Sequence, residues 1–299
     1  LDDSASLLAH IAGQSFYNTS KLTFDTLVSS DPDNILDNTL DYLSGFSSNV
    51  RDIITRFGFP QEVEHMAEAG ILLRVLGKIA SPRLDLSPAH LSNMEMGSLY
   101  EELLRLASDL SNKEAGDHFT PREVIALMVS ILVSDTPDLH TPGKVFTVYD
   151  PACGTGGMLT EAEHHLLEMN KQCKVHLFGE EIALKSHAVC TSDMLIKGQD
   201  ASRILRKDTL DGDGFPNQRF DYVLANPPFN DSDWFRKDDD VRWKYGVPPK
   251  GNANFAWVQH FIHHLAPDGF AGSAGCCAGC RGRVRRSSSA RRRSRACRR

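Results

Sequence analysis

The stretch from Val145 to Leu159 is the sequence feature that most limits what this chain can fold into. Its first part, Val145–Tyr149, is rich in β-branched and aromatic residues, as expected of an inner β-strand. Asp150 follows, and then comes a glycine turn, residues 154–157, whose backbone can turn tightly and approach a ligand closely. A helix that begins near Gly157 directs its first amide groups toward such a ligand. This order of strand, acid, glycine turn and helix predicts a nucleotide-type binding loop.

The glycine spacing separates this turn from two common phosphate-binding loops. The pattern is G-x-G-G rather than G-x-G-x-x-G, and no Lys-Ser or Lys-Thr pair follows, so the turn is not a P-loop. Considered alone, the turn also fits a purely structural connection between a strand and a helix.

Polar residues stand at the ends of four predicted strands. Strands predicted over residues 145–149, 175–181, 204–208 and 220–225 alternate with helices, which indicates an α/β fold with a parallel sheet and right-handed crossovers. The carboxyl ends of parallel strands share one edge of the sheet, and ligands bind there in such folds. We therefore expect four residues to line one edge: Asp150, Glu181, Asp208 and Asn226.

The chain divides into three predicted segments. Residues 1–115 space apolar groups three and four apart, for example over 50–57 and 63–79, and predict a helical scaffold or interaction domain. Residues 116–271 form the predicted α/β domain, and residues 272–299 form an Arg-rich tail. Near the start of the α/β domain, Thr120 suits a helix N-cap and Pro121 the first position of an apolar helix that runs to Val133.

Charge is distributed unevenly along the 299 residues. The total net charge is −6, but residues 271–299 contain ten Arg and no Lys, Asp or Glu, so the other 270 residues carry −16. A protein that acidic does not resemble a free-standing nucleic-acid binder. If the substrate is DNA, we expect a partner subunit to supply the phosphate contacts.

The sequence shows no segment that targets the chain to a membrane or a secretory route: no apolar run reaches membrane-spanning length and no signal peptide is visible. Seven Cys at irregular spacings favour a reduced, cytoplasmic setting.

The segment Asn226-Pro227-Pro228-Phe229 follows a predicted buried strand and carries a second chemical pattern. Alone, it could be a Pro-Pro turn that ends the strand. The turn sequence Asp-Pro-Ala-Cys-Gly-Thr-Gly-Gly, however, resembles the S-adenosylmethionine (AdoMet) loop of DNA adenine methyltransferases. Beside such a loop, stiff prolines would fix the Asn226 amide oxygen and the Pro227 carbonyl as acceptors for the two hydrogens of an exocyclic amine.

That arrangement predicts amine methylation by positioning and electrostatics, without a covalent enzyme intermediate. The nitrogen lone pair would point at the sulfonium methyl of AdoMet, and Phe229 would stack on a base flipped out of the duplex. Methylation at cytosine C5 needs a cysteine nucleophile at the catalytic strand end. Cys153 lies instead in the glycine turn, where we expect it to be a packing residue.

The order of His118-Phe119-Thr120-Pro121-Arg122, the glycine turn, Gly179-Glu180-Glu181 and Asn-Pro-Pro-Phe resembles the modification subunit of type I restriction–modification systems. The resemblance covers roughly residues 15–270. It implies a Rossmann-like AdoMet-dependent methyltransferase domain behind a helical N-terminal domain, acting on adenine N6 in DNA with a specificity subunit and a restriction subunit. It also implies catalytic residues Asn226, Pro227, Pro228 and Phe229, and cofactor-binding residues Asp117, His118, Phe119, Thr120, Pro121, Arg122, Asp150, Gly154, Thr155, Gly156, Gly157, Glu181 and Asp208. Among these, Glu181 would bind the ribose hydroxyls and Asp208 the adenine amine.

Two other functions stay open at this point. Methyltransferases of protein glutamine or RNA also use Asn-Pro-Pro with an aromatic residue, although they typically lack the Phe-Thr-Pro-Arg helix start. The chain could also be a remnant that binds partner subunits without catalysis.

The segment 231–251 interleaves Trp234, Trp243 and Tyr245 with basic residues. Aromatic and basic residues together suit contact with unstacked bases, whereas the three acidic residues 238–240 oppose it. We expect a mobile loop and leave DNA contact open. A helix is predicted over 254–265, and the fifth strand should begin at Phe270.

The tail after Gly272 has no hydrophobic period, so we expect the fifth strand not to form and the sheet to be incomplete. A basic nucleic-acid-binding tail and a metal site at Cys277-x-x-Cys280 are alternatives, but no second ligand pair stands at zinc spacing. We interpret the tail as a frameshift product. The N-terminal domain also looks shortened before Phe16, and we expect a poorly stable, inactive polypeptide.

Overall fold

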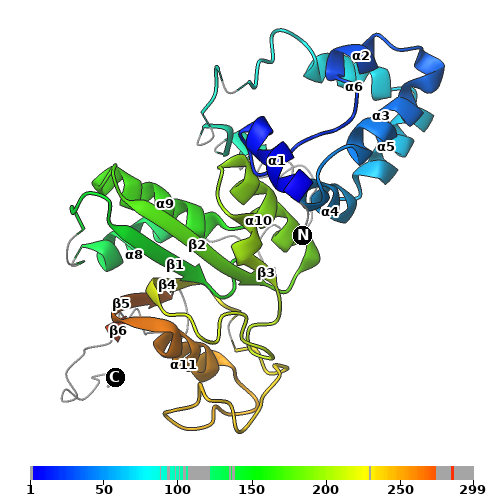
Figure 1. The fold of residues 1–299 in the computed structure, drawn as a ribbon. Coiled ribbons are helices and arrows are strands. Elements are labelled where there is room, and N and C mark those ends of the chain that lie inside the picture. The colour runs from blue at the N-terminus through cyan, green and yellow to red at the C-terminus, as the bar shows by residue number, and fades with distance from the viewer. Residues whose placement is uncertain are drawn as a thin grey trace. The chain divides into compact units, whose positions relative to one another are not determined.

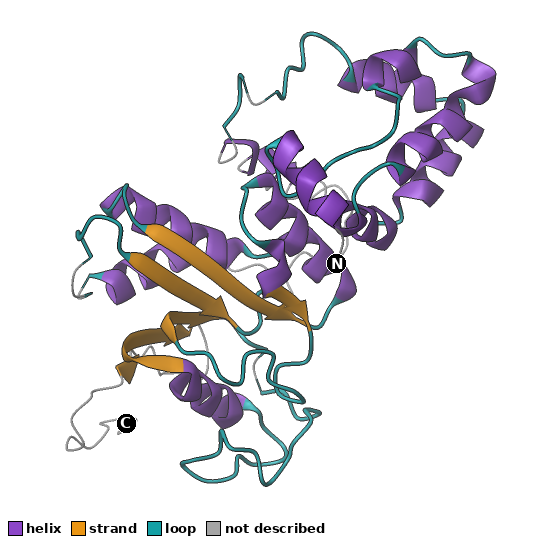
Figure 2. Ribbon diagram, in the orientation of Figure 1, coloured by secondary structure: helices purple, strands orange, loops and turns teal. Residues whose placement is uncertain are grey.

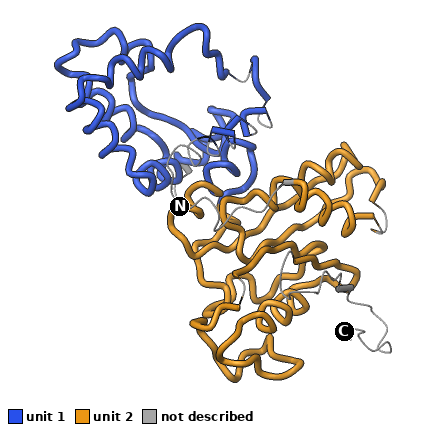
Figure 3. The backbone as a smooth tube through the Cα atoms, turned by 180° about the vertical axis from the view of Figure 1, so that it is seen from behind, with its two compact units in different colours: residues 1–113, 191–201 blue, residues 114–190, 202–299 orange. Residues whose placement is uncertain are grey.

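The computed structural model describes residues 3–87, 89–92, 95–97, 99–100, 102–103, 106, 122–134, 136, 139–228, 230–273 and 284–285. None of the helices within these ranges combines the length and the apolar character needed to span a bilayer. The chain forms two compact units, residues 1–113 with 191–201 and residues 114–190 with 202–299 (Figure 3). The predicted three-way division at residues 115 and 271 stays a prediction, because most of the tail lies outside the described residues.

The first unit is helical, as its apolar spacing predicts. Four buried side chains, Ile35, Val63, Leu72 and Leu76, form its core. The apolar period over 63–79 does not form one helix, because Gly70 takes a φ of +65° and separates two helices. The helices are α1 (Asp3–Ala12), α2 (Phe24–Val28), η1 (Pro32–Asn34), α3 (Ile35–Ser44), α4 (Ser48–Arg56), α5 (Phe59–Glu68) and α6 (Leu72–Ile79). The described residues between 95 and 106 are helical as well.

The second unit is built on a six-stranded sheet in the order β3-β2-β1-β4-β5-β6, with the first five strands parallel (Figures 1 and 2). The strands are β1 (Val145–Asp150), β2 (Lys174–Glu181), β3 (Ile204–Arg206), β4 (Phe220–Ala225), β5 (Leu265–Ser273) and β6 (Val284–Arg285). Its helices are α8 (Arg122–Val133), α9 (Gly157–Met169) and α11 (Asn254–His264). The boundary between the units falls within α10 (Leu184–Ile196), whose residues from Thr191 belong to the first unit, and within the short η2 (Ala201–Arg203), whose first residue does. β1 leads toward β2 and β3 on one side, whereas β4 and β5 lie on its other side.

Alternating side chains of the central strands pack on two faces of this sheet. On one face, Tyr149 and Val223 belong to a core that includes Trp257 and Phe261 of α11. On the other face, α9 packs on β1 and β2, and α8 packs on β5. Strands buried on both faces are expected in a parallel sheet, which explains their near-continuous apolar sequences.

The expectation that the fifth strand would not form is wrong. Leu265 pairs with Phe220, the register shifts, and the ladder resumes with Phe270 opposite Tyr222 and continues to Ser273 opposite Ala225. Within the tail, Val284 and Arg285 pair antiparallel with β5. Backbone hydrogen bonding to a buried neighbour therefore extends the sheet beyond the point at which the side-chain pattern fades.

Candidate functional site

The glycine turn joins the carboxyl end of β1 to the first residue of α9. Gly156 adopts a φ of +90°, and a Cβ there would lie 2.7 Å from Cys190 Sγ, so both backbone conformation and packing require glycine. Gly154 has a φ of +55°, and its N–H donates to Glu181 Oε2 at 2.8 Å. Thr155 lies half-buried in the same turn, and Gly157 begins α9. The turn is thus held in one conformation by β2 and α10.

Strand register brings the predicted polar residues to one edge of the sheet. Asp150 pairs with Gly179 of β2, so Glu181 extends two residues beyond it. Arg206 of β3 pairs with Glu181, and Asp208 extends two residues further. On the other side of β1, Tyr149 pairs with Val223 of β4, so Asn226 also lies just past the level of Asp150. Strand order reverses between β1 and β4, which is the point where open α/β sheets bind ligands.

The Glu181 carboxylate connects the glycine turn to the residues that follow β2. Its Oε1 accepts a hydrogen bond from Ala183 N–H at 2.7 Å, and Oε2 accepts the one from Gly154. Each carboxylate oxygen keeps further lone pairs, and Glu181 is half-buried, so a ligand hydroxyl can still reach it. Ile182, the next residue, is 62% exposed and offers an apolar surface at the same edge. The sequence analysis missed Ile182, since a single apolar residue after a strand carries no distinct pattern.

Two other carboxyl groups at this edge sit in different surroundings. Asp208 lies beyond the end of β3, rather than within the strand as predicted, and its Oδ1 accepts from Leu210 N–H at 2.9 Å. Asp150 is almost fully buried, and its Oδ1 accepts from Ala152 N–H at 3.0 Å. Burial raises the pKa of Asp150 to about 8, although the Ala152 hydrogen bond works in the opposite direction.

The Asn-Pro-Pro segment leaves β4 beside the glycine turn. Asn226 Oδ1 and the Pro227 side chain are buried, whereas Pro228 is exposed. Phe229 lies outside the described residues, as do Asp117, His118, Phe119, Thr120 and Pro121. Arg122 begins α8, but its side chain is not among the described parts.

Three asparagines that the sequence analysis missed hold the chain just after this segment. Asn230, with a φ of +54°, accepts hydrogen bonds at its Oδ1 from the side-chain amides of Asn252 and Asn254, each at 3.1 Å. Its own N–H donates to Asn254 Oδ1 at 3.0 Å. Asparagine is enriched among non-glycine residues at positive φ, but the spacing of 22 and 24 residues gives no local pattern. The clamp ties the end of the Asn-Pro-Pro-Phe segment to the start of α11.

Contact of Trp234 and Trp243 with unstacked bases, which the sequence left open, is contradicted by their burial. Both belong to the core that α11 shares with the sheet, and their rings pack edge to face with centroids 6.0 Å apart. Tyr245 is exposed. The segment 231–251 therefore uses its tryptophans to pack onto the domain, a tertiary effect that local composition does not reveal.

Cys153 is a packing residue, as predicted. It is buried, with its Sγ 3.9 Å from Cys190 Sγ. The contact with Cys190, together with burial, holds the pKa of its thiol well above the ordinary value, so it does not present a thiolate nucleophile.

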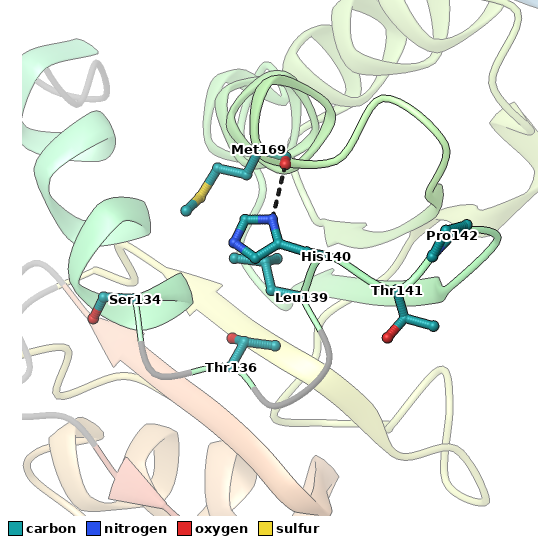
Figure 4. A pocket seen from close by; sticks show the side chains of 7 residues that line it. All are labelled: Ser134, Thr136, Leu139, His140, Thr141, Pro142 and Met169. Carbon is teal, nitrogen blue, oxygen red and sulfur yellow. Dashed lines mark hydrogen bonds between the residues drawn. The ribbon is translucent and has the colours of Figure 1, made fainter.

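A surface cavity of about 590 Å³ lies at the opposite edge of the sheet and is separate from this site (Figure 4). Leu139, His140, Thr141 and Pro142 of its lining precede β1, and Met169 ends α9. His140 Nδ1 lies 3.2 Å from the Met169 carbonyl oxygen, which joins the two sides of the cavity. None of the residues predicted to bind a ligand lines it.

Comparison with known proteins gives concordant matches. A family model described as N-6 DNA Methylase matches residues 92–275. The Type I restriction enzyme HindI methylase subunit of Haemophilus influenzae is 30% identical over 240 residues, which are 79% of this chain and 52% of that protein. This chain thus spans about half the length of that relative.

Solved structures show the same fold. A type I restriction-modification system methyltransferase subunit from Streptococcus thermophilus matches with a TM-score of 0.66 and 25% identity, over 91% of this chain and 59% of that one. A putative class I S-adenosylmethionine-dependent methyltransferase from Listeria monocytogenes matches with a TM-score of 0.50 and 19% identity, over 84% of this chain and 71% of that one. The predicted fold class is confirmed.

Proposed function

The chain belongs to the N-6 DNA methylase family, and from this premise we propose that it transfers a methyl group from AdoMet to the N6 amine of adenine in DNA. The observation that carries the proposal is the strand register that brings the glycine turn, Glu181, Asp208 and Asn226 to one edge at the switch between β1 and β4. This is the place where a nucleoside cofactor and a second substrate can meet.

The residues at this edge fit AdoMet. A Cβ at Gly154 or Gly157 would meet nothing within 4 Å, so the outer side of the turn has room for a ligand. The first amides of α9 favour electron-rich groups there. Glu181 would accept hydrogen bonds from the ribose hydroxyls, Ile182 would cover one face of the adenine, and Asp208 would accept from its amine. When bound, AdoMet supplies the electrophilic methyl group.

Asn226 and Pro227 would hold the target amine. The buried Oδ1 of Asn226 and the Pro227 carbonyl are two acceptors, which suits an amine with two hydrogens. The Asn230 clamp restricts the chain directly after this segment. Because orientation is the main requirement, we propose that Asn226 acts by positioning the nitrogen lone pair toward the methyl group, and that no side chain forms a covalent bond.

We also propose that the chain acts as part of a larger assembly. The protein similar to it in Haemophilus influenzae is named a methylase subunit of a type I restriction enzyme. A specificity subunit that reads the DNA and a restriction subunit would complete such a complex. The net charge of −16 outside residues 271–299 supports a partner that supplies phosphate contacts.

Replacing Asn226 tests the proposal. Asn226→Ala removes one acceptor of the amine, and we expect methyl transfer to adenine in DNA to fall about 10³-fold while AdoMet affinity changes less than about threefold. Transfer of labelled methyl groups is measured in the presence of a specificity subunit, and AdoMet binding is measured by calorimetry. Asn217→Ala is the matched control, because Asn217 is an exposed amide near the amino end of β4. An Asn226→Ala variant as active as Asn217→Ala contradicts the proposed role.

A further inference from the structure

Arg242 is a buried cation in the segment that follows the Asn-Pro-Pro-Phe motif. It is 2% exposed, and its guanidinium donates in three directions. Its Nε and one terminal nitrogen bind the Asp240 carboxylate at 2.7–3.0 Å. Its two terminal nitrogens donate to the carbonyl oxygens of Thr209 at 2.6 Å and Leu210 at 2.8 Å. One of them also donates to His260 Nδ1 at 3.0 Å.

The two carbonyls that Arg242 binds belong to the residues directly after Asp208. This short segment lies beyond the end of β3, so no strand pairing fixes it. Its other anchors are the Thr209 hydroxyl, which donates to the Pro151 carbonyl at 2.6 Å, and the Leu210 N–H, which donates to Asp208 itself. Arg242 therefore holds the main chain of Thr209 and Leu210 from the segment 231–251, and Lys237 of the same segment donates to the next carbonyl, that of Asp211, at 3.2 Å.

A second set of hydrogen bonds connects Arg242 to β2 through His260 and Tyr149. Because Arg242 donates to His260 Nδ1, that nitrogen carries no proton, and the neutral ring holds its proton on Nε2. Nε2 lies 2.9 Å from the Tyr149 hydroxyl, which donates in turn to Glu180. Burial, with the positive charges nearby, keeps the pKa of His260 well below its ordinary value, consistent with a neutral ring. This row of hydrogen bonds from Arg242 thus ends at Glu180, the residue directly before Glu181.

The same hydrogen bonds also explain a group of three side chains whose spacing would suit a metal ion. Asp213, His260 and His264 present ligand atoms within 4.8 Å of one another. However, His264 Nε2 lies 3.0 Å from Asp213 Oδ2, and both nitrogens of His260 are engaged by Arg242 and Tyr149. A guanidinium 3.0 Å from His260 opposes a second cation, so hydrogen bonding accounts for the group.

We propose that Arg242 is a positioning residue of the cofactor site: it reaches from the segment after Asn226 to fix the main chain that carries Asp208, and so sets the preference for adenine in the cofactor. The inference rests on the proposed function, because it takes the adenine amine of AdoMet as the partner of Asp208. The proposal thus gives the segment 231–251 a role in the cofactor site through its buried Arg242, and the exposed residues of the segment do not indicate that role.

Substitution by lysine separates this role from charge alone. Lys keeps the positive charge but cannot span the Asp240 carboxylate and two carbonyls with a planar fork of donors. Arg236→Lys is the matched control. Arg236 lies in the same segment and binds the Pro248 carbonyl and Asp238, and it makes none of the contacts to Thr209 or Leu210.

The experiment compares two ligands on the full chain by calorimetry: S-adenosylhomocysteine, and the same molecule with hypoxanthine in place of adenine. Hypoxanthine has an oxygen where adenine has its amine, so a carboxylate at Asp208 disfavours it. We expect the wild-type protein to prefer the adenine compound, and Arg242→Lys to lose about tenfold in that ratio. Arg236→Lys should keep the wild-type ratio. A loss of stability alone lowers the folded fraction for both ligands and leaves the ratio unchanged.

The outcomes are distinct. A wild-type ratio in Arg242→Lys overturns the inference and leaves the proposed function intact, as does a wild-type protein that binds both ligands equally. A wild-type protein that binds neither ligand overturns both. If circular dichroism shows that Arg242→Lys is unfolded, Asp240→Asn is measured in the same way, since it removes the negative charge that holds the Arg242 guanidinium at 2.7–3.0 Å. An unchanged ratio in a folded Asp240→Asn then overturns the inference.

Discussion

At the scale of single residues, the protein places two carboxyl groups beneath the glycine turn where water cannot reach them. Burial raises the pKa of Asp150 to about 8 and that of Glu180 to about 7. For Glu180, hydrogen bonds from Tyr149 and Gly214 oppose the effect of burial. Such groups stabilise the fold most when protonated, so the site depends on pH even before a ligand binds.

Asp150→Asn is expected to reduce the pH dependence of stability. The folded-state pKa of about 8 exceeds the ordinary value of 3.8, so the folded protein holds an extra proton between these values and loses stability as pH rises through them. The loss from this group is at most about 1.4 kcal/mol per pH unit. Asn keeps an oxygen for the Ala152 N–H and has no proton to lose, so urea unfolding should show a smaller loss of stability toward alkaline pH.

Asp239→Asn is the control for this change, because it removes one exposed carboxylate from the segment 231–251. If Asp150→Asn and Asp239→Asn show the same pH dependence as the wild-type protein, Asp150 is already ionised in the fold and the prediction is wrong.

Sequence reasoning located the residues whose roles are local and missed those whose roles come from tertiary contacts. The glycine turn, Glu181 and Asn226 follow from strand ends and from backbone requirements, and the structure brings them to one edge. Arg242 and Asn230 meet their partners across 32–33 and 22–24 residues respectively, and nothing in the intervening sequence indicates which carbonyl or amide they bind.

At the scale of elements, apolar content predicted β4 with its observed bounds and β1 to within one residue, because both are buried central strands; Asp150, expected to follow the first strand, is its last residue. β5 was misjudged for a physical reason. Its ladder is interrupted between Leu265 and Phe270, and its later residues are small, so backbone pairing with β4 maintains it rather than side-chain pattern. The packing of the 231–251 segment was misjudged because exposed and buried tryptophans look identical in sequence.

Gly156→Ala should destabilise the connection between β1 and α9. A Cβ at Gly156 would combine a φ of +90° with a 2.7 Å approach to Cys190 Sγ. We expect a loss of about 2–4 kcal/mol in the free energy of unfolding, measured by urea titration. Gly157→Ala is the matched control: its Cβ meets nothing within 4 Å and its φ is not positive, so stability should stay equal or rise slightly. Equal stabilities of the two variants would show that the turn relaxes freely.

At the scale of the whole molecule, charge separates residues 1–270, the acidic body, from the Arg-rich tail. Residues 1–270 carry −16, whereas residues 271–299 carry ten Arg. An acidic body repels the DNA backbone, so sequence-independent binding by the isolated chain must come from the Arg-rich residues. Productive binding at the proposed site then needs a partner whose basic surface outweighs the charge of the body.

This division of charge predicts how the isolated chain binds random duplex DNA. Seven Arg lie in the tail beyond β6, and replacing all of them by Ser keeps the Val284–Arg285 pairing with β5 while lowering the net charge by seven: Arg286, Arg291, Arg292, Arg293, Arg295, Arg298 and Arg299. Each phosphate contact contributes about −0.9 to the slope of log K against log salt concentration, so replacing seven Arg should make the slope of the variant shallower than that of the wild-type chain by up to about 6. Fluorescence anisotropy over a salt series measures both. A variant that retains the wild-type slope would place the DNA contacts on the acidic body and remove the electrostatic need for a partner.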